Sequence, residues 1–332
     1  MVDDKLENWS DVSQRLQCSG ILIGNGASCA VWKDFGYASL FQIAQEPGQT
    51  HKLGQQELAV FTAFDTKNFE QVLGALNSAR IVNNALGLPA TEIPPRYTAI
   101  QNALVEAVKC KHVPWQSVPS STLSCIQRAL LDYKFVYSTN YDLLAYWALM
   151  HESGPHLSKD LFWDTVFNLS NTDVWSKSTV ILYLHGGLHL YRTSDGRTLK
   201  RQAQTGANLL DLFGVPLVSY PDCTPLFVSE GTASDKLRSI YRSDYLAFAY
   251  LQLMRHEGPL CVFGSALGDS DQHLIDAIKN AKVRDIAFSI RPNDSTKVIA
   301  NKASAIAKMP WAALHFFNST THPLGNPNLQ IA

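Results

Sequence analysis

The chain has 332 residues, of which 46% are hydrophobic and 17% charged, and its formal net charge is -1 at pH 7. This composition is typical of a globular protein with a buried core and excludes an intrinsically disordered chain. The near-zero charge gives no general attraction to nucleic acid or anionic membranes, and no apolar run approaches the roughly 18 residues of a membrane span.

The first residues, Met1 to Lys5, do not show the positively charged start followed by an apolar stretch that is typical of a secretory signal peptide. None of the six cysteines forms a Cys-x-x-Cys pair, so neither a zinc site nor a disulfide framework has its expected spacing. We therefore expect a reduced, cytoplasmic protein without a bound metal.

Short, continuous apolar runs mark the expected strands. Such runs suit strands that are covered on both faces, as in parallel sheets. In chain order they lie at residues 20–23, 135–137, 180–184, 225–228, 260–263, 286–290 and 314–317.

Helical patterns separate these runs, most clearly at residues 271–281 and 294–308. Alternating strands and helices predict an α/β fold, with a Rossmann-like, doubly wound and mainly parallel sheet. We expect residues 1–332 to form a single domain of this kind.

Strand-like runs are missing between residues 36 and 132. Helical patterns at residues 69–86 and 97–111 occupy this interval, which prolines such as Pro94 and Pro95 punctuate. We interpret residues 36–132 as a large helical insertion after the first strand. Residues 153–178 form a second, smaller excursion.

A glycine-rich turn follows the first predicted strand and consists of Gly24, Asn25, Gly26, Ala27 and Ser28. Glycine allows backbone N–H groups to approach a pyrophosphate, and the N-terminus of the next helix adds positive potential. Taken alone, the turn is equally compatible with an ordinary strand-to-helix connection.

A polar segment follows the second predicted strand and consists of Ser138, Thr139, Asn140, Tyr141 and Asp142. An amide and a carboxylate two residues apart suit a ribose hydroxyl and a carboxamide. The alternative is that Asn140 or Asp142 caps the next helix, and for either residue alone a cap is the more common role.

His185 and Gly186 follow the third predicted strand. A histidine that titrates near neutral pH suits a general base, and a glycine gives a ligand close access. The alternative is a polar residue that simply ends a strand. His189 lies four residues further on, but helical spacing is not expected after glycines, so a metal site here is disfavoured.

Gly264 and Ser265 follow the run at residues 260–263, and acidic residues that include Asp269 and Asp271 come next. Small residues at the end of a strand form a turn that is compatible with a nucleotide. The carboxylates could equally stabilise the start of the following helix through its dipole.

In this order, the four segments resemble the motifs of the sirtuin family. Residues 24–28 resemble the Gly-Ala-Gly-Ile-Ser turn and residues 138–142 resemble Thr-Gln-Asn-Ile-Asp. His185 with Gly186 resembles the pair that carries the sirtuin catalytic histidine. Gly264 and Ser265 resemble the Gly-Thr-Ser-Leu turn, and Arg291 lies where sirtuins keep a strand end beside the adenosine.

The chain departs from deacylase sirtuins after His185. Those enzymes carry a four-cysteine zinc module there, whereas here no cysteine occurs before Cys223. The resemblance therefore implies a sirtuin-like fold with no zinc module and no cleft for an acyl-lysine peptide. It is closest to bacterial sirtuin-like proteins of antiphage defence, including the type paired with a HerA-type ATPase.

The resemblance implies an NAD+ glycohydrolase that depletes cellular NAD+ during abortive infection, with NAD+ as substrate and a homo-oligomer as the expected state. Asn140 would position the nicotinamide ribose or a water, Asp142 the carboxamide, and His185 would accept a proton. The NAD+-binding residues would be Gly24, Asn25, Gly26, Ala27, Ser28, Ser138, Thr139, Gly264, Ser265 and Arg291. The alternatives are an NAD-dependent deacylase or ADP-ribosyltransferase, and a non-hydrolytic sensor of NAD or ADP-ribose.

Overall fold

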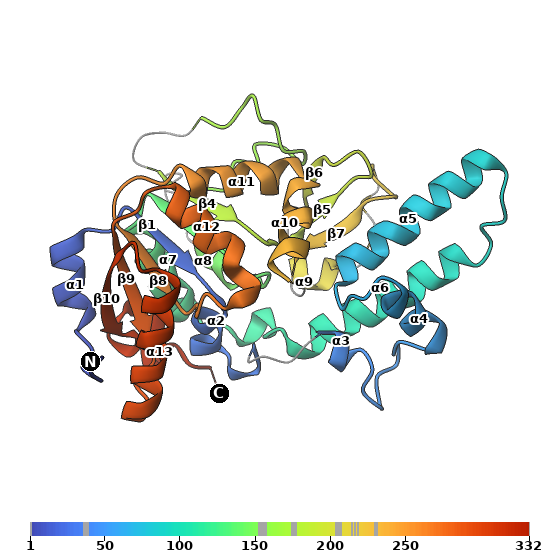
Figure 1. Ribbon diagram of the computed structural model, residues 1–332. Coiled ribbons are helices and arrows are strands. Elements are labelled where there is room, and N and C mark those ends of the chain that lie inside the picture. Colours follow the sequence, from blue (N-terminus) through green and yellow to red (C-terminus); the bar gives the residue numbers. More distant parts are fainter. Residues whose placement is uncertain are drawn as a thin grey trace.

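A seven-stranded sheet forms the centre of the computed structural model, which describes residues 2–35, 40–151, 158–173, 178–202, 208–213, 215, 217, 219–228 and 232–331 (Figure 1). Every neighbouring pair of its strands is parallel. The expected α/β class with a mainly parallel sheet is confirmed. The strands are β1 (Gly20–Ile23), β2 (Phe135–Ser138), β3 (Ser158–Lys159), β4 (Thr179–Tyr183), β8 (Leu260–Phe263), β9 (Asp285–Ile290) and β10 (Ala313–Asn318).

The strand order is β10-β9-β8-β1-β2-β4-β3. From β1, the chain adds β2 and β4 on one side and β8, β9 and β10 on the other, which is consistent with a Rossmann-like fold. In such sheets, ligands bind outside the carboxyl ends of the strands, where the order reverses. Here the reversal lies between β1 and β8, and Ile23 is level with both Phe263 and Ser138.

Helices cover both faces of this sheet. In Figure 1, α11 (Asp244–Met254) and α12 (Gln272–Asn280) lie in front of it, and α7 (Ser120–Leu131) and α8 (Leu144–Met150) lie behind it. Every residue of β1, β4 and β8 is therefore buried, which explains their continuous apolar sequences.

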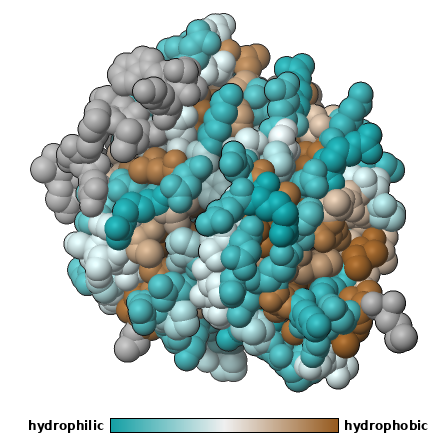
Figure 2. All heavy atoms as spheres, turned by 90° about the vertical axis from the view of Figure 1, so that its left-hand side faces the viewer, coloured by the Kyte–Doolittle hydropathy of each residue, from teal (hydrophilic) through white to brown (hydrophobic). Residues whose placement is uncertain are grey.

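One flank of the sheet carries α1 (Trp9–Leu16) and α13 (Ser295–Lys308), which contact β9. Figure 2 shows this flank to be mostly hydrophilic, with apolar residues in small, separate groups. α2 (Asn25–Val31) follows β1 directly, and α10 (Ala233–Tyr241) packs against α11 and α12.

The described residues of the expected insertion contain α3 (Leu40–Ile43), α4 (Gln55–Ala63), α5 (Phe69–Leu86) and α6 (Ile93–Lys111), and also α7, which covers the main sheet; residues 36–39 lie outside the description. α5 and α6 pack together into an arm that projects from the body (Figure 1). α6 begins at Ile93 and not at Tyr97, because Pro94 and Pro95 fall in its first turn, where proline is tolerated. Within the described ranges, no helix is long and apolar enough to cross a membrane.

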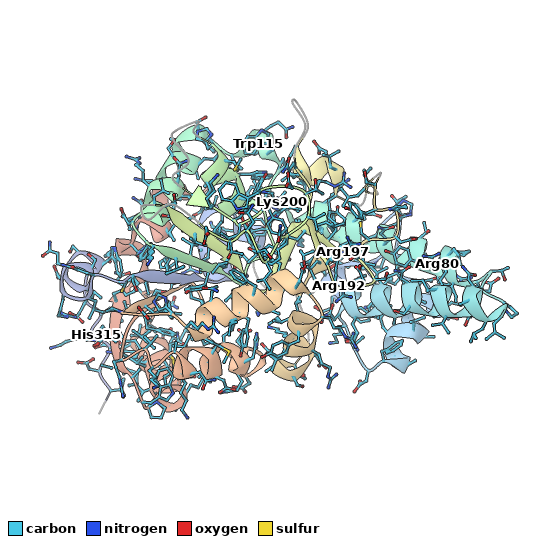
Figure 3. The ribbon with its side chains drawn as sticks, turned by 90° about the horizontal axis from the view of Figure 1, so that it is seen from above. Arg80, Trp115, Arg192, Arg197, Lys200 and His315 are labelled. Atoms are coloured by element: carbon cyan, nitrogen blue, oxygen red, sulfur yellow. The ribbon has the colours of Figure 1, made fainter. Side chains whose placement is uncertain are left out.

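A second, antiparallel sheet has the order β6-β5-β7 and consists of β5 (Gly186–Arg192), β6 (Thr198–Lys200) and β7 (Thr224–Phe227). Placing the run at residues 225–228 among the parallel strands was therefore wrong, because β7 is a buried strand that pairs with β5 in an antiparallel sense. Figure 3 shows Arg192 and Arg197 where this sheet meets α5, far from His315. The short α9 (Leu209–Leu212) contacts β5.

Residues of the second predicted excursion, 153–178, are only partly described. Residues 152–157 and 174–177 lie outside the described residues, and β3 falls between these two gaps. β3 pairs with β4 at the edge of the main sheet. Residues 229–231, which include Glu230, also lie outside the described residues.

Candidate functional site

The four sequence motifs meet at the carboxyl edge of the main sheet. β1, β2, β4 and β8 end side by side, and each motif follows one of them. α12 follows β8 in the chain, and its His273 contacts His185, which follows β4.

The two glycine-containing turns are packed directly against each other. Gly26 donates its N–H to the carbonyl oxygen of Gly264 at 2.7 Å, and a Cβ at Gly26 would lie 2.7 Å from Gly264 Cα. Gly264 itself has a φ of 68°, which favours glycine. Its N–H donates to Ser289 Oγ at 2.9 Å. These glycines therefore permit the contact between the turns after β1 and β8.

This packing uses N–H groups that the glycine-rich turn was expected to offer to a pyrophosphate. Gly26 donates to Gly264, and Ala27 donates to the carbonyl oxygen of Gly24 at 2.9 Å. The side chain of Asn25 donates to the carbonyl oxygen of Phe35 at 2.8 Å. Pyrophosphate binding by this turn stays a prediction, and the two amides would have to exchange partners.

A buried polar cluster joins α2 to the end of β2. Ser28 Oγ donates to Asp142 Oδ2 at 2.5 Å, and Asn140 Nδ2 donates to Ser28 Oγ at 2.9 Å and to the carbonyl oxygen of Gly24 at 3.1 Å. Ser28, Asn140 and Asp142 are 3%, 8% and 5% exposed. The expected proximity of the Gly24 turn and the Asn140 turn is therefore present.

Asn140 Oδ1 is the unusual atom of this cluster. It is buried and has no hydrogen-bond partner among the described groups. Such an acceptor costs about 1–3 kcal/mol unless a ligand or water satisfies it. Asn140, Ser28 and Asp142 line a cavity of about 20 Å³, which is enough for about one water molecule.

The capping alternative is wrong as stated, because the N-cap residue of α8 is Leu143 and neither Asn140 nor Asp142 occupies that position. Asp142 still contacts the start of the helix, since its Oδ1 accepts the N–H of Leu144 at 2.9 Å. The side chain of Asn140 points instead to Gly24 and Ser28. Asp142 therefore makes two kinds of contact: it accepts the N–H of Leu144 at the start of α8, and it accepts the hydroxyl of Ser28 in the buried cluster.

His112, at the end of α6, supports this loop and was missed by the sequence analysis. Its Nε2 accepts the N–H of Leu143 at 2.9 Å, so Nδ1 carries the proton that is donated to the carbonyl oxygen of Val113. Burial lowers the pKa of His112, against an opposing effect of Asp142. The neutral ring fixes the segment between Asp142 and α8, but no sequence pattern links these positions.

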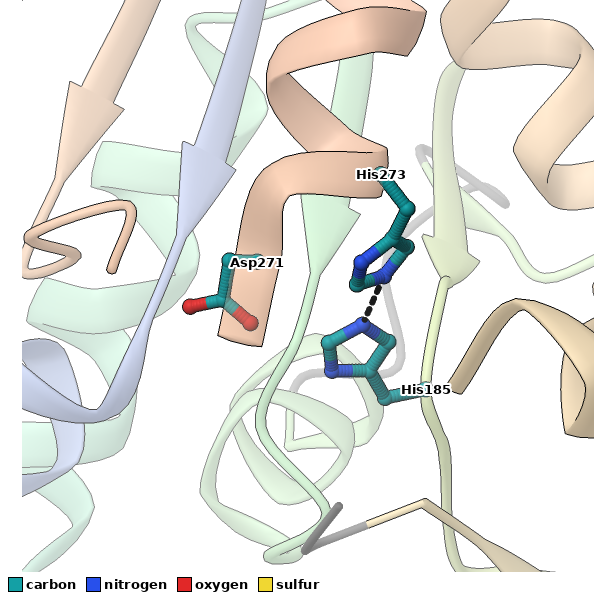
Figure 4. Close-up of side chains that lie close together, drawn as sticks. All are labelled: His185, Asp271 and His273. Carbon is teal, nitrogen blue, oxygen red and sulfur yellow. Dashed lines mark hydrogen bonds between the residues drawn. The ribbon is translucent and has the colours of Figure 1, made fainter. Parts of the chain in front are cut away.

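His185 lies at the same edge but faces a second histidine. Its Nε2 is 2.9 Å from His273 Nε2, and both side chains are buried (Figure 4). Burial, followed by the charge of Lys236, lowers the pKa of His185 well below its usual value and that of His273 to about 4. Both rings are therefore neutral at pH 7. The sequence analysis did not identify His273. The signal that could have identified it is its place two residues after Asp271, at the start of the predicted helix.

Gly186, next to His185, has a structural reason to be glycine. Its φ is 76°, and a Cβ would lie 2.2 Å from the carbonyl oxygen of Leu226 in β7. The residue therefore turns the chain from β4 into the small sheet. Access for a ligand is not what requires this glycine.

Asp271 completes a group of three donors of the kinds that bind metals. Among the described residues, the ligand atoms of His185, Asp271 and His273 lie within 4.8 Å of one another. Zinc bonds of about 2.0–2.1 Å would hold two ligand nitrogens about 3.4 Å apart with both lone pairs aimed at the ion. Here the two Nε2 atoms are closer and face each other, and Lys236 Nζ binds Asp271 Oδ1 at 2.7 Å. The geometry favours a shared proton over a metal ion.

The remaining predicted residues contribute to the edge in different ways. Ser138 Oγ accepts the N–H of Asn140 at 3.2 Å, and Thr139 Oγ1 donates to the carbonyl oxygen of Ile23 at 3.1 Å, so both shape the turn. Ser265 Oγ accepts the N–H of Leu267. Arg291 is exposed at the end of β9, and its charge lowers the pKa of Cys29 in α2 against the larger effect of burial.

A larger cavity of about 430 Å³ lies elsewhere, between α5 and the small sheet. Arg192, Thr193 and Gly74 are among its lining residues, and it contains none of the four motifs. Size alone would favour it as a ligand site. We base the candidate site on the carboxyl edge instead, because the unpartnered Asn140 Oδ1 and the histidine pair lie there.

Comparison with known families gives one match over most of the chain. The family described as "Domain of unknown function (DUF4917)" matches residues 21–324, which include all four motifs. No curated protein matches the chain.

Proposed function

The chain belongs to the DUF4917 family, and we propose that it is an NAD+ glycohydrolase, which cleaves NAD+ to nicotinamide and ADP-ribose. The observation that carries the proposal is the environment of Asn140. Its amide nitrogen donates to Gly24 and Ser28, while its buried Oδ1 has no hydrogen-bond donor among the described groups. A ribose hydroxyl or a water supplies such a donor. The position beside the strand-order reversal is where dinucleotides bind in doubly wound sheets.

In the proposed reaction, the bond between nicotinamide and ribose C1′ breaks and its electron pair leaves with nicotinamide. A water oxygen attacks C1′ of the oxocarbenium-like sugar, and one proton is released. Asn140 Oδ1 orients the water or the ribose, and His185 accepts the proton. Because the cationic sugar reacts readily with water, positioning and fixed dipoles supply most of the rate.

Asp142 has a second role in this proposal. Its oxygens already accept from Ser28 and Leu144, and a carboxylate can accept further donors, such as the N–H of the nicotinamide carboxamide. The adenosine side would lie toward Gly264, Ser265 and Arg291. Because the cavity at Asn140 holds about one water, NAD+ binding must open this edge.

The course of the chain after His185 favours hydrolysis over deacylation. The chain turns at Gly186 into β5, and β5 forms an antiparallel sheet with β6 and β7. The chain has no cysteine between His185 and Cys223 to build the zinc module of deacylases. Water is then the natural acceptor of the ADP-ribosyl group.

We further propose a role as a cytoplasmic effector of antiphage defence, which acts by depleting NAD+. Such an enzyme requires control, and a homo-oligomer or a HerA-type ATPase partner would supply it. The arm of α5 and α6 offers a surface for this contact, with exposed apolar side chains near its tip at Ile81, Val82, Leu86 and Leu88.

Nicotinamide release from NAD+ by the purified protein tests the proposal. Asn140→Ala should reduce the rate by about 10²-fold or more. The matched control is Asn77→Ala, which removes a buried amide on α5 that donates to the carbonyl oxygen of Asp222. Equal rates for the wild type and Asn140→Ala would contradict the assignment.

The second candidate is a protein that binds NAD+ or ADP-ribose without cleaving it. It is favoured by the engagement of His185 Nε2 with His273, which occupies one nitrogen of the base. Calorimetric titration with both ligands distinguishes the two functions. Tight binding without nicotinamide release, with and without a HerA-type partner, would support the sensor.

A further inference from the structure

Two buried histidines face each other at the carboxyl edge, and the proposed reaction uses only one of them. His185 follows β4, and His273 lies in the first turn of α12, with 2.9 Å between their Nε2 atoms (Figure 4). A hydrogen bond between two imidazoles requires a proton on one nitrogen and a lone pair on the other. The pair therefore has two possible directions.

We infer that His273 is a positioning residue for His185 and sets which nitrogen of His185 receives the substrate proton. The inference rests on the proposed function, since it assigns a partner to the proposed base. His273 plays the part that an orienting group plays for a catalytic histidine: it fixes the tautomer and the ring orientation.

The two directions differ in chemistry. When His185 donates through Nε2–H, its Nδ1 holds a lone pair and can accept a proton. When His273 donates instead, His185 Nδ1 carries a hydrogen and cannot act as a base. His185 can accept the substrate proton only when the hydrogen bond runs in the first direction. After a proton has been transferred through the pair, the hydrogen bond runs in the second direction.

The transfer balances within the pair. A proton arrives at His185 Nδ1, the proton on His185 Nε2 moves to His273 Nε2, and the proton on His273 Nδ1 leaves. That last nitrogen is buried without a hydrogen-bond partner among the described groups, and Figure 4 shows it on the side of the ring toward Asp271. The proposed path for this proton is one water between this nitrogen and Asp271, which belongs to the same group of side chains.

The charges around the pair keep it neutral. Lys236 from α10 lowers the pKa of both rings, after burial as the main cause, while Asp271 and Asp276 raise that of His273. Tyr250 from α11 donates its hydroxyl to the carbonyl oxygen of His273 at 2.8 Å and holds the start of α12 in place. One proton, and not two, therefore lies between the rings at pH 7.

The test replaces His273 by phenylalanine, which keeps a ring but removes both nitrogens. In ¹⁵N-histidine-labelled protein, long-range ¹H–¹⁵N correlation reports which His185 nitrogen carries the proton. We expect one dominant tautomer in the wild type and a mixture in His273→Phe. We also expect kcat for nicotinamide release to fall about 10²-fold with KM for NAD+ unchanged. His273→Gln, which keeps an acceptor, should restore part of kcat and serves if His273→Phe does not fold.

His256→Phe is the matched control. His256 is also buried, but it contacts Ser19 and Tyr137 near the amino end of β1. An unchanged His185 tautomer in both His273 variants would overturn the inference, and so would stoichiometric zinc in the wild-type protein, because the group would then be a metal centre. If the wild type releases no nicotinamide, the proposed function fails, while the tautomer measurement still decides whether His273 positions His185.

Discussion

Gly26 donates its N–H to the carbonyl oxygen of Gly264 at 2.7 Å, and this bond joins the turn after β1 to the turn after β8. The two turns are far apart in the sequence. Their contact closes the point where the strand order reverses.

Gly26→Ala tests this contact. The new Cβ would lie 2.7 Å from Gly264 Cα, and backbone atoms cannot rotate away, so the two turns must separate. We expect a loss of about 1–3 kcal/mol in the free energy of unfolding. Urea denaturation measures it. Gly268→Ala is the control, because nothing lies within 4 Å of a Cβ there. Equal stability of the two variants would contradict the packing.

The sequence was informative where local pattern and burial coincide. β8 is an uninterrupted apolar run because it is covered on both faces, and α5 has the bounds that its pattern predicts. The proximity of Asn140 to the Gly24 turn followed from the order of the strands. The role of each residue in NAD+ chemistry stays a prediction.

Other features depend on contacts that no local pattern encodes. β5 contains glycines and a histidine and becomes a strand because β7 and β6 pair with it. His273 meets His185 across 88 positions of the chain, and Lys236 reaches Asp271 from another helix. Contacts of this kind depend on how the sheet arranges its strand ends, so they cannot be predicted from the local sequence.

Acid should destabilise the protein. Burial lowers the pKa of His189 and of His322 to about 3, from 6.5 in the unfolded chain. As pH falls below about 6.5, the unfolded chain binds protons first, so this stability is complete above that pH and is lost as pH falls toward 3. Each histidine contributes up to about 1.4 kcal/mol per pH unit. Urea unfolding at pH 7 and pH 5 measures the slope, and His322→Asn should make it shallower. Identical stability at both pH values would contradict the burial of these neutral rings.

The arm should mediate self-association. Leu86 at the end of α5 is 67% exposed, and a glutamate there would place a charge in an apolar contact. We expect light scattering to show an oligomer for the wild type and a lower mass for Leu86→Glu. Leu169→Glu is the matched control, since Leu169 is 65% exposed but belongs to neither α5 nor α6. An oligomer that survives Leu86→Glu and loses mass with Leu169→Glu would place the contact elsewhere.

Ser28 should contribute both to the stability of the protein and to the rate of the proposed reaction. Its hydroxyl donates to Asp142 and accepts from Asn140, so Ser28→Ala leaves a buried carboxylate oxygen without this donor and frees one side of the Asn140 amide. We expect a loss of about 1–3 kcal/mol in stability. If Asn140 Oδ1 orients the ribose or water, a shift of about 1 Å should also reduce kcat for NAD+ hydrolysis about 10²-fold.

A purely structural cluster would lose stability but keep kcat in the folded fraction. Ser243→Ala separates these outcomes, because Ser243 is equally buried and caps α11 without touching the edge. The two variants should therefore lose similar stability, while only Ser28→Ala loses turnover measured well below its melting temperature.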